Sequence, residues 1–106
     1  MTVSRGEVWW GAIAGLGSRP VLIVSAQALN RVLTEVILAR ITSVDRERAI
    51  PSFVTLDVGE VLPERIFVIC HNLFTLPTSV LRDHAGTLTA DRMLEVDDAL
   101  RHALGL

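Results

Sequence analysis

Short apolar runs with the alternation of β-strands fill most of the chain before residue 76. The pattern predicts strands over residues 6–13, 19–25, 34–42, 52–57 and 65–70, the last continuing into 71–75. The run 19–25 is almost wholly apolar, which is typical of a strand buried on both faces. Pro20 should lie near the start of its strand because proline cannot donate a hydrogen bond to the ladder. Pro77 should end the last strand.

The segments between these runs have the composition of connections. The glycine-rich stretch 14–18 predicts a turn, and 26–33 predicts a connection with room for one helical turn. The mixed charges of 45–48 are typical of a solvated loop. His84 is assigned to a loop as well.

The end of the chain has the period of a helix. Its apolar stripe consists of Met93, Val96, Leu100 and Ala103 or Leu104. Thr89 should cap the N-terminus and Gly105 should end the helix, while Asp97 should face solvent. About five strands followed by one helix predict a curled antiparallel sheet or small barrel, capped by the helix.

The composition is that of a small folded domain. The 106 residues are 50% hydrophobic and 21% charged, which excludes a disordered chain and predicts one domain over residues 1–106. No apolar run approaches the roughly 20 residues that cross a bilayer, so no membrane partner is expected. The start lacks the apolar core of a secretion signal, and a single cysteine forms no internal disulfide. A cytoplasmic location is therefore expected.

The charge pattern limits how this chain could bind nucleic acid. All ten basic residues are arginines, whose planar guanidinium groups suit phosphate or carboxylate. The net charge is −2, with the basic residues in excess up to residue 50 and the acidic residues in excess after it. A protein that binds nucleic acid through bulk charge is normally basic. Any nucleic acid must therefore be held at a local site.

The candidate chemistry lies where two apolar runs meet polar residues. Arg19 comes directly before one run, and Thr42 and Ser43 follow the run 36–41. If these runs pair as strands, a guanidinium and two hydroxyls meet at one sheet end, where they can hold a phosphate. Phosphodiester chemistry is the first hypothesis, and an ordinary sheet edge is the alternative. Metal binding is not expected, because the three histidines and Cys70 lack ligand spacing.

Several motifs, in order along nearly the whole chain, resemble those of one protein family. They are Arg5-Gly6-Glu7-Val8-Trp9, Arg19-Pro20-Val21-Leu22-Ile23-Val24-Ser25, Ile41-Thr42-Ser43, Gly86-Thr87-Leu88, Leu94-Glu95-Val96, Ala99-Leu100-Arg101 and Leu104-Gly105-Leu106. Each motif alone is weak, whereas their ordered combination is specific. Together they resemble the MazF/PemK-type toxins of type II toxin–antitoxin systems.

The resemblance implies a fold, an activity and partners. The fold would be an SH3-like small barrel of about five to seven mostly antiparallel strands, capped by a C-terminal helix and assembled as a homodimer. The activity would be metal-independent, cofactor-free, sequence-specific cleavage of single-stranded RNA to 2′,3′-cyclic phosphate and 5′-hydroxyl ends, which inhibits translation and growth. The partners would be RNA and a cognate antitoxin whose tail lies across the RNA site. The positions that match the family's catalytic residues are Arg19 and Thr42.

The residues at these positions suit distinct roles. Arg19 can stabilise charge that grows on the phosphoryl oxygens, and Thr42 can position one of them. His71 stands where the family usually has an aspartate, and an imidazole can transfer a proton near neutral pH. His71 is therefore a hypothetical third catalytic residue, with an ordinary strand-end histidine as the alternative. The predicted RNA-binding residues are Ser18, Ser43, Trp10 and Asn72, whereas Trp9 is expected in the core.

Two departures from the family keep other functions open. The loop 14–18 is shorter than the family's and lacks its Gly-x-Glu-Gln-like segment, and the net charge is acidic. A catalytically weak or inactive binding module of the same fold is one alternative. A CcdB-type gyrase-binding toxin is another, although this chain ends Leu104-Gly105-Leu106 rather than in the Trp-Gly-Ile of that group.

Overall fold

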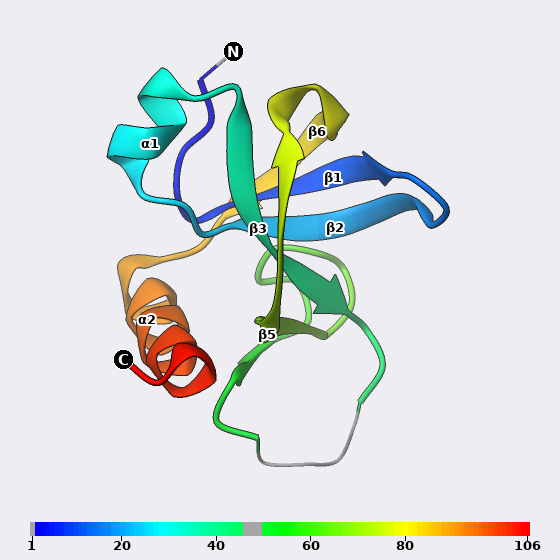
Figure 1. Ribbon diagram of the computed structural model, residues 1–106. Helices are drawn as coiled ribbons and strands as arrows, with labels where there is room; N and C mark the ends of the chain where they lie inside the picture. The colour runs from blue at the N-terminus through cyan, green and yellow to red at the C-terminus, as the bar shows by residue number, and fades with distance from the viewer. Residues whose placement is uncertain (1, 46–49) are drawn as a thin grey trace.

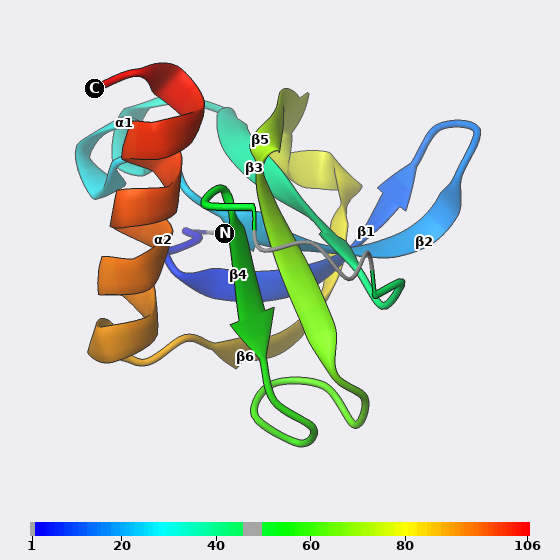
Figure 2. The ribbon, with the colours of Figure 1, turned by 90° about the horizontal axis from the view of Figure 1, so that it is seen from below.

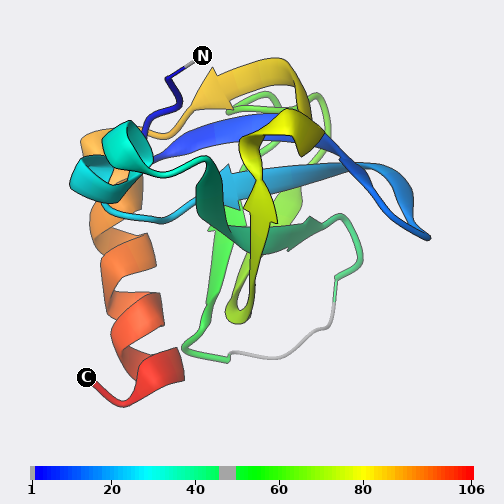
Figure 3. The ribbon, with the colours of Figure 1, turned by 45° about the horizontal axis from the view of Figure 1, so that its top comes forward.

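The computed structural model describes residues 2–45 and 50–106, and in them six strands form one curled antiparallel sheet (Figure 1). The elements are β1 (Glu7–Ile13), β2 (Gly17–Ile23), α1 (Gln27–Val32), β3 (Glu35–Thr42), β4 (Phe53–Leu56), β5 (Ile66–Pro77), the short 3-10 helix η1 (Thr78–Val80), β6 (Leu81–Thr87) and α2 (Ala90–Leu104). The strand order is β4-β5-β3-β2-β1-β6. The sheet curls into a half-barrel with α2 along one side (Figure 3), which confirms the predicted fold class. Of the predicted loop 45–48, residues 46–48 lie outside the described part.

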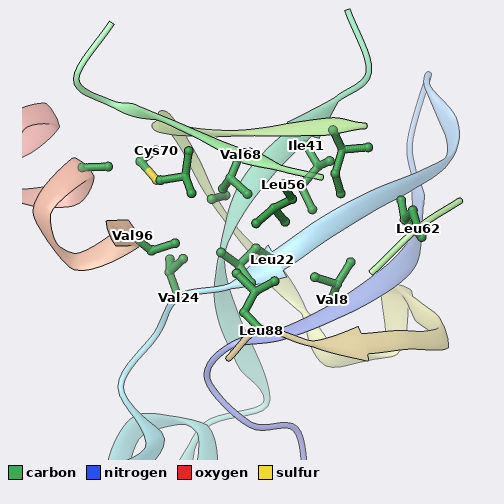
Figure 4. Packing of buried hydrophobic residues seen from close by; sticks show 14 residues of the cluster. Val8, Leu22, Val24, Ile41, Leu56, Leu62, Val68, Cys70, Leu88 and Val96 are labelled. Atoms are coloured by element: carbon green, nitrogen blue, oxygen red, sulfur yellow. The ribbon is translucent and has the colours of Figure 1, made fainter. Parts of the chain in front are cut away.

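The curl buries both faces of the central strands. Consecutive residues of a strand point to opposite faces, so Leu22 of β2 joins one core cluster while Val21 and Ile23 join another. This double burial accounts for the nearly all-apolar run in β2. Figure 4 shows the first cluster, in which side chains from several strands converge and Val96 of α2 approaches from the side. Trp9 is buried in the second cluster, as predicted.

Helix α2 begins and ends as its sequence predicts. The Thr89 side chain accepts a hydrogen bond from the backbone N–H of Arg92 at 3.2 Å, and Gly105 ends the helix with a φ of 72°. Val96 and Ala99 are buried against the sheet. No helix in the described part of the chain is long and apolar enough to cross a membrane.

Asp97 does not face solvent as predicted. It is half-buried, and its carboxylate accepts a hydrogen bond of 2.6 Å from the guanidinium of Arg5. Arg5 also donates from Nε to the carbonyl of Val24 at 3.0 Å. The prediction was wrong because the N-terminal segment packs beside the helix and brings a cation to Asp97, which helical spacing alone cannot show.

A tight hairpin joins β1 to β2. Ile13 pairs with Gly17, and both Gly15 and Gly17 have φ values near 80°, at 81° and 77°, in the left-handed region that favours glycine. The hairpin extends away from α2 (Figure 2). Pro20 pairs with β1, whereas the ladder between β2 and β3 begins only at Val21. The missing donor of Pro20 therefore interrupts no bond to β3.

Two features of the sheet were not predicted. Strand β6, which contains His84, is an edge strand paired only with β1, and its charged residues Arg82 and Asp83 are exposed. It lacks the apolar alternation that marks a strand, so the assignment of His84 to a loop was wrong. Strand β5 is also irregular. Leu73 pairs with Ala39 of β3 but Ile69 pairs with the next residue of β3, so residues 70–72 have no partner there.

Candidate functional site

The pairing of β2 with β3 brings the predicted residues to one end of the sheet. Val21 pairs with Arg40, and two residues farther along each strand come Arg19 and Thr42. Because alternate residues of a strand share a face and directly paired residues lie on the same face, these four side chains belong to one face. The predicted meeting of a guanidinium and a hydroxyl at a strand end therefore has a structural basis in the register.

A hollow of about 390 Å³ opens at this end of the sheet. We call it the strand-end hollow, and it is lined by Trp10, Ser18, Arg19, Pro20, Arg40, Ile41, Thr42, Ser43, Val44, Glu64 and Ile66. It brings together five of the seven residues that the sequence predicts for the site. Four strands contribute to it, β1, β2, β3 and β5, together with the two residues that follow β3 and the loop before β5.

A second hollow, of about 230 Å³, adjoins the first and is largely apolar in its lining. This apolar hollow is lined by Ile13, Leu16, Arg19, Pro20, Val21, Arg40, Ile41, Asn72 and Phe74. Arg19 and Arg40 line both hollows, so they lie between the two. Asn72, a predicted RNA-binding residue, meets Arg19 here rather than in the strand-end hollow. Asn72 belongs to the irregular part of β5, residues 70–72, which has no pairing partner on β3.

The charges around the hollows leave two cations available. Among the described residues, neither Arg19 nor Arg40 forms an ion pair, and Arg19 donates only to its neighbour, the Ser18 carbonyl, at 3.5 Å. Glu64 is the one carboxylate that lines the strand-end hollow within that part of the chain. Among the described residues that line the hollow, two guanidinium groups and one carboxylate give a positive balance. A site of this kind can hold an anion although the whole chain is acidic.

The hydroxyl of Thr42 is already oriented by the backbone. Its Oγ1 accepts a hydrogen bond from the N–H of Val44 at 3.1 Å. A threonine hydroxyl carries one donor and two acceptor lone pairs, so the O–H of Thr42 remains available to donate. Donation to a phosphoryl oxygen is the chemistry that this arrangement allows.

His71 occupies a different place from the other predicted catalytic residues. It does not line either hollow. Its Nδ1 lies 2.6 Å from the hydroxyl of Ser52, and its ring stacks on Phe53 with the ring centres 5.4 Å apart. The structure thus assigns His71 packing partners on the side of β4, and its catalytic role stays a prediction.

Arg40 and Glu64 line the strand-end hollow but were not among the predicted site residues. A signal for Arg40 was present, because an arginine interrupts the apolar run 36–41 two residues before Thr42, on the same strand face. Glu64 comes from the loop between β4 and β5. Only the folding of that loop against β3 brings Glu64 near the site, so spacing in the sequence gives no indication of it.

Cys70 is fully buried in the first core cluster, and burial raises the pKa of its thiol to about 11. At neutral pH it is therefore a protonated thiol and not a nucleophile. Among the described residues, no group of three or more histidine, cysteine, aspartate or glutamate side chains is arranged to hold a metal ion. The predicted independence of metal stays a prediction.

Comparison with known proteins identifies the family. The model of the family described as "PemK-like, MazF-like toxin of type II toxin-antitoxin system" matches residues 4–104. The endoribonuclease MazF1 of Mycobacterium bovis is 35% identical over 102 residues, covering 96% of this chain and 92% of that protein. Probable endoribonuclease MazF5 of Mycobacterium tuberculosis is 33% identical, covering 95% and 92%.

Solved structures agree with this result. A mycobacterial endoribonuclease in complex with its cognate antitoxin has a TM-score of 0.87 at 35% identity, covering 98% of this chain and 96% of that one. MazF in a MazE–MazF complex from Deinococcus radiodurans has a TM-score of 0.80 at 26% identity, covering 100% and 98%. The chain belongs to the PemK-like, MazF-like toxin family of type II toxin–antitoxin systems, which confirms the resemblance seen in its motifs.

Proposed function

We propose that this toxin is an endoribonuclease that cuts single-stranded RNA at short sequences without a metal ion, leaving 2′,3′-cyclic phosphate and 5′-hydroxyl ends. The observation that carries the proposal is the strand-end hollow, in which Arg19, Thr42 and Ser43 line one positively charged site. The relatives are named as endoribonucleases, which supports the same activity. Cleavage of cellular RNA would inhibit translation and growth.

The proposed reaction is a transesterification within the RNA. The 2′-oxygen loses its proton and attacks the adjacent phosphorus, the bond from phosphorus to the 5′-oxygen breaks, and the leaving 5′-oxygen takes up a proton. Arg19 stabilises the negative charge on the phosphoryl oxygens through two parallel hydrogen bonds. Thr42 donates a hydrogen bond from its hydroxyl to one of these oxygens, while its Oγ1 accepts the hydrogen bond from the N–H of Val44.

Two side chains are candidates for removing the proton from the 2′-hydroxyl. Glu64 lines the strand-end hollow, where a carboxylate can act as a general base. His71, the candidate from the sequence, lies beside Ser52 and Phe53. Because Glu64 lines the hollow and His71 does not, the geometry favours Glu64 for the proton transfer. The variants Glu64→Gln and His71→Ala separate the two roles.

The proposed partners are single-stranded RNA, a cognate antitoxin and a second copy of the chain. The solved relatives include toxins crystallised with their antitoxins, which supports an antitoxin partner here. Trp10, half-buried and lining the hollow, offers a surface on which a base can stack. Ser18, Ser43 and Asn72 provide polar contacts to the RNA at the two hollows. We place this single-domain toxin in the cytoplasm, where its substrate and antitoxin would be made.

The test is cleavage of a long, end-labelled RNA in the presence of EDTA. The wild type is expected to cut at a few short sites and to leave cyclic phosphate ends, whereas Arg19→Ala should lose about 10²-fold or more in rate because the transition-state charge is no longer balanced. Arg82→Ala, which removes an exposed arginine from β6, is the matched control and should cut like the wild type.

Two results would contradict the proposal. A folded wild type that cuts none of several RNAs would favour a binding module, and a gyrase supercoiling assay would then test the CcdB-type alternative. Equal cutting by wild type and Arg19→Ala would exclude Arg19 from the chemistry.

A further inference from the structure

We propose that Arg40 binds the phosphate next to the one that is cleaved, and so fixes the register of the RNA across the two hollows. This inference rests on the proposed function, because it assigns a second phosphate to the same binding surface. Arg40 is a residue of β3 and was not among the site residues predicted from the sequence.

The position of Arg40 in the sheet carries the proposal. It pairs directly with Val21 of β2, so it is the diagonal neighbour of Arg19 on the same sheet face, at a Cβ separation of roughly 7–8 Å. Two arginines at this separation can reach two neighbouring phosphates of one strand or converge on one phosphate, and replacement of single phosphates distinguishes these two cases. Both side chains line both hollows.

The surroundings of Arg40 leave its guanidinium group accessible to a ligand. Arg40 is exposed, and it forms no ion pair with any other described residue. Its strand neighbours on the same face, Leu38 and Val36, are fully buried, whereas Arg40 lies where that face opens to solvent. The Arg40 side chain forms no hydrogen bond or ion pair within the described chain, so its charge is available to a phosphate of the RNA backbone.

The apolar hollow provides room for the nucleoside that separates two neighbouring phosphates of RNA. Each phosphate of RNA is joined to the next through one nucleoside, which is large and mostly flat. The apolar hollow, which Arg19 and Arg40 both line, measures about 230 Å³ and has Phe74 in its lining. A nucleoside can therefore be accommodated while the two guanidinium groups hold the phosphates on either side of it.

The experiment uses a short RNA that contains a cleavage site mapped with the wild type, with a 2′-deoxy nucleotide at the cut so that it binds but is not cleaved. Its dissociation constant is measured by fluorescence anisotropy over a range of salt concentrations. Arg40→Gln should weaken binding roughly tenfold or more, and should reduce the salt slope by about 0.7 for the lost contact with a single strand. Arg82→Gln is the matched control and should match the wild type in both quantities.

A second measurement identifies the phosphate. In a series of the same RNA, each phosphate in turn is replaced by an uncharged methylphosphonate. Replacement of the phosphate next to the cut should weaken binding to the wild type but should weaken binding to Arg40→Gln no further. Arg40→Lys, which keeps a positive charge, should retain most of the salt slope.

The outcomes separate this inference from the proposed function. A wild type that neither binds nor cuts RNA would overturn both. A wild type that binds and cuts RNA, together with an unchanged salt slope in folded Arg40→Gln, would overturn the role of Arg40 alone. The same conclusion would follow if the methylphosphonate series gave identical profiles for the two proteins.

Discussion

At the scale of single residues, the chemistry depends on which group lies in the strand-end hollow. Arg19 and Thr42 come from adjacent strands whose register is fixed by the core pairs behind them. The loop between β1 and β2, residues 14–16, contains no carboxylate. Glu64 approaches the same hollow from the loop before β5, so a carboxylate is available from a different part of the chain.

A comparison of Glu64→Gln with His71→Ala tests the proton transfer. Glu64→Gln should lower kcat about 10²-fold, because a positioned general base typically contributes at least that much. The charged groups that face Glu64 in the hollow, Arg19 and Arg40, remain in this variant. His71→Ala should cut at nearly the wild-type rate, since its ring contacts Ser52 and Phe53 instead.

Glu35→Gln serves as the control for the change of a glutamate to an amide. Glu35 is exposed at the opposite end of β3 from Thr42, where it pairs with Pro77. The opposite order of effects, with His71→Ala the slower enzyme, would assign the proton transfer to His71.

At the scale of elements, the sequence was sufficient wherever burial follows a regular period. Strands β1 to β4 and helix α2 were predicted within a few residues, because each shows a regular apolar pattern or a capping signal. Edge strand β6 was missed because only one neighbour pairs with it and most of its residues are exposed. The irregular pairing of residues 70–72 in β5 could not be predicted either, since it depends on the register with β3.

The same distinction applies to the candidate site. Arg19, Thr42 and Ser43 were predictable because they flank apolar runs that had to pair in the sheet. Glu64 could not be predicted, because a loop of no regular period brings it to the hollow.

Arg92 of α2 ties the helix to the loop after β4. Its guanidinium donates to both carboxylate oxygens of Glu60 at 2.8 and 2.9 Å, and also to Glu95 at 2.8 Å and Asp57 at 3.3 Å. The hydrogen bonds from Arg92 hold the pKa of Glu60 below its usual value. An acid with a lowered pKa stabilises the fold above its unfolded pKa, and loses this contribution as the pH falls through its folded pKa.

Replacement of Arg92 by alanine should therefore lower the free energy of unfolding by about 1 kcal/mol at neutral pH. The difference from the wild type should be smaller at about pH 3, because the contribution of Glu60 is lost as the pH falls from the ordinary pKa of a glutamate toward its own lowered pKa. Urea unfolding at the two pH values measures both effects. Arg101→Ala on the same helix, which breaks only the exposed pair with Asp98, should change stability by less than about 0.5 kcal/mol. A loss of equal size at both pH values would contradict the role of Glu60.

At the scale of the whole molecule, the charges are separated in space as well as in sequence. Arg5, Arg92 and Arg101 form ion pairs with acidic residues on or near α2. Arg19 and Arg40, at the hairpin end of the sheet, have no such partner among the described residues. Figure 2 shows the hairpin and α2 on opposite sides of the molecule. A chain of net charge −2 can therefore present a locally positive surface to RNA.

The buried thiol of Cys70 can report when helix α2 separates from the sheet. Because it lies in the same cluster as Val96 and Ala99 of α2, a thiol reagent can reach it only when the helix and sheet separate. Because the pKa of this thiol is raised to about 11, the folded protein should resist alkylation at pH 8. The slow labelling rate should then measure the population of the open form.

Arg92→Ala should label about fivefold faster, as a loss of about 1 kcal/mol requires. Rapid labelling of the folded wild type would show that the half-barrel opens without unfolding. Labelling of this single cysteine would thus measure how often the toxin opens, both in the free state and with RNA or antitoxin bound.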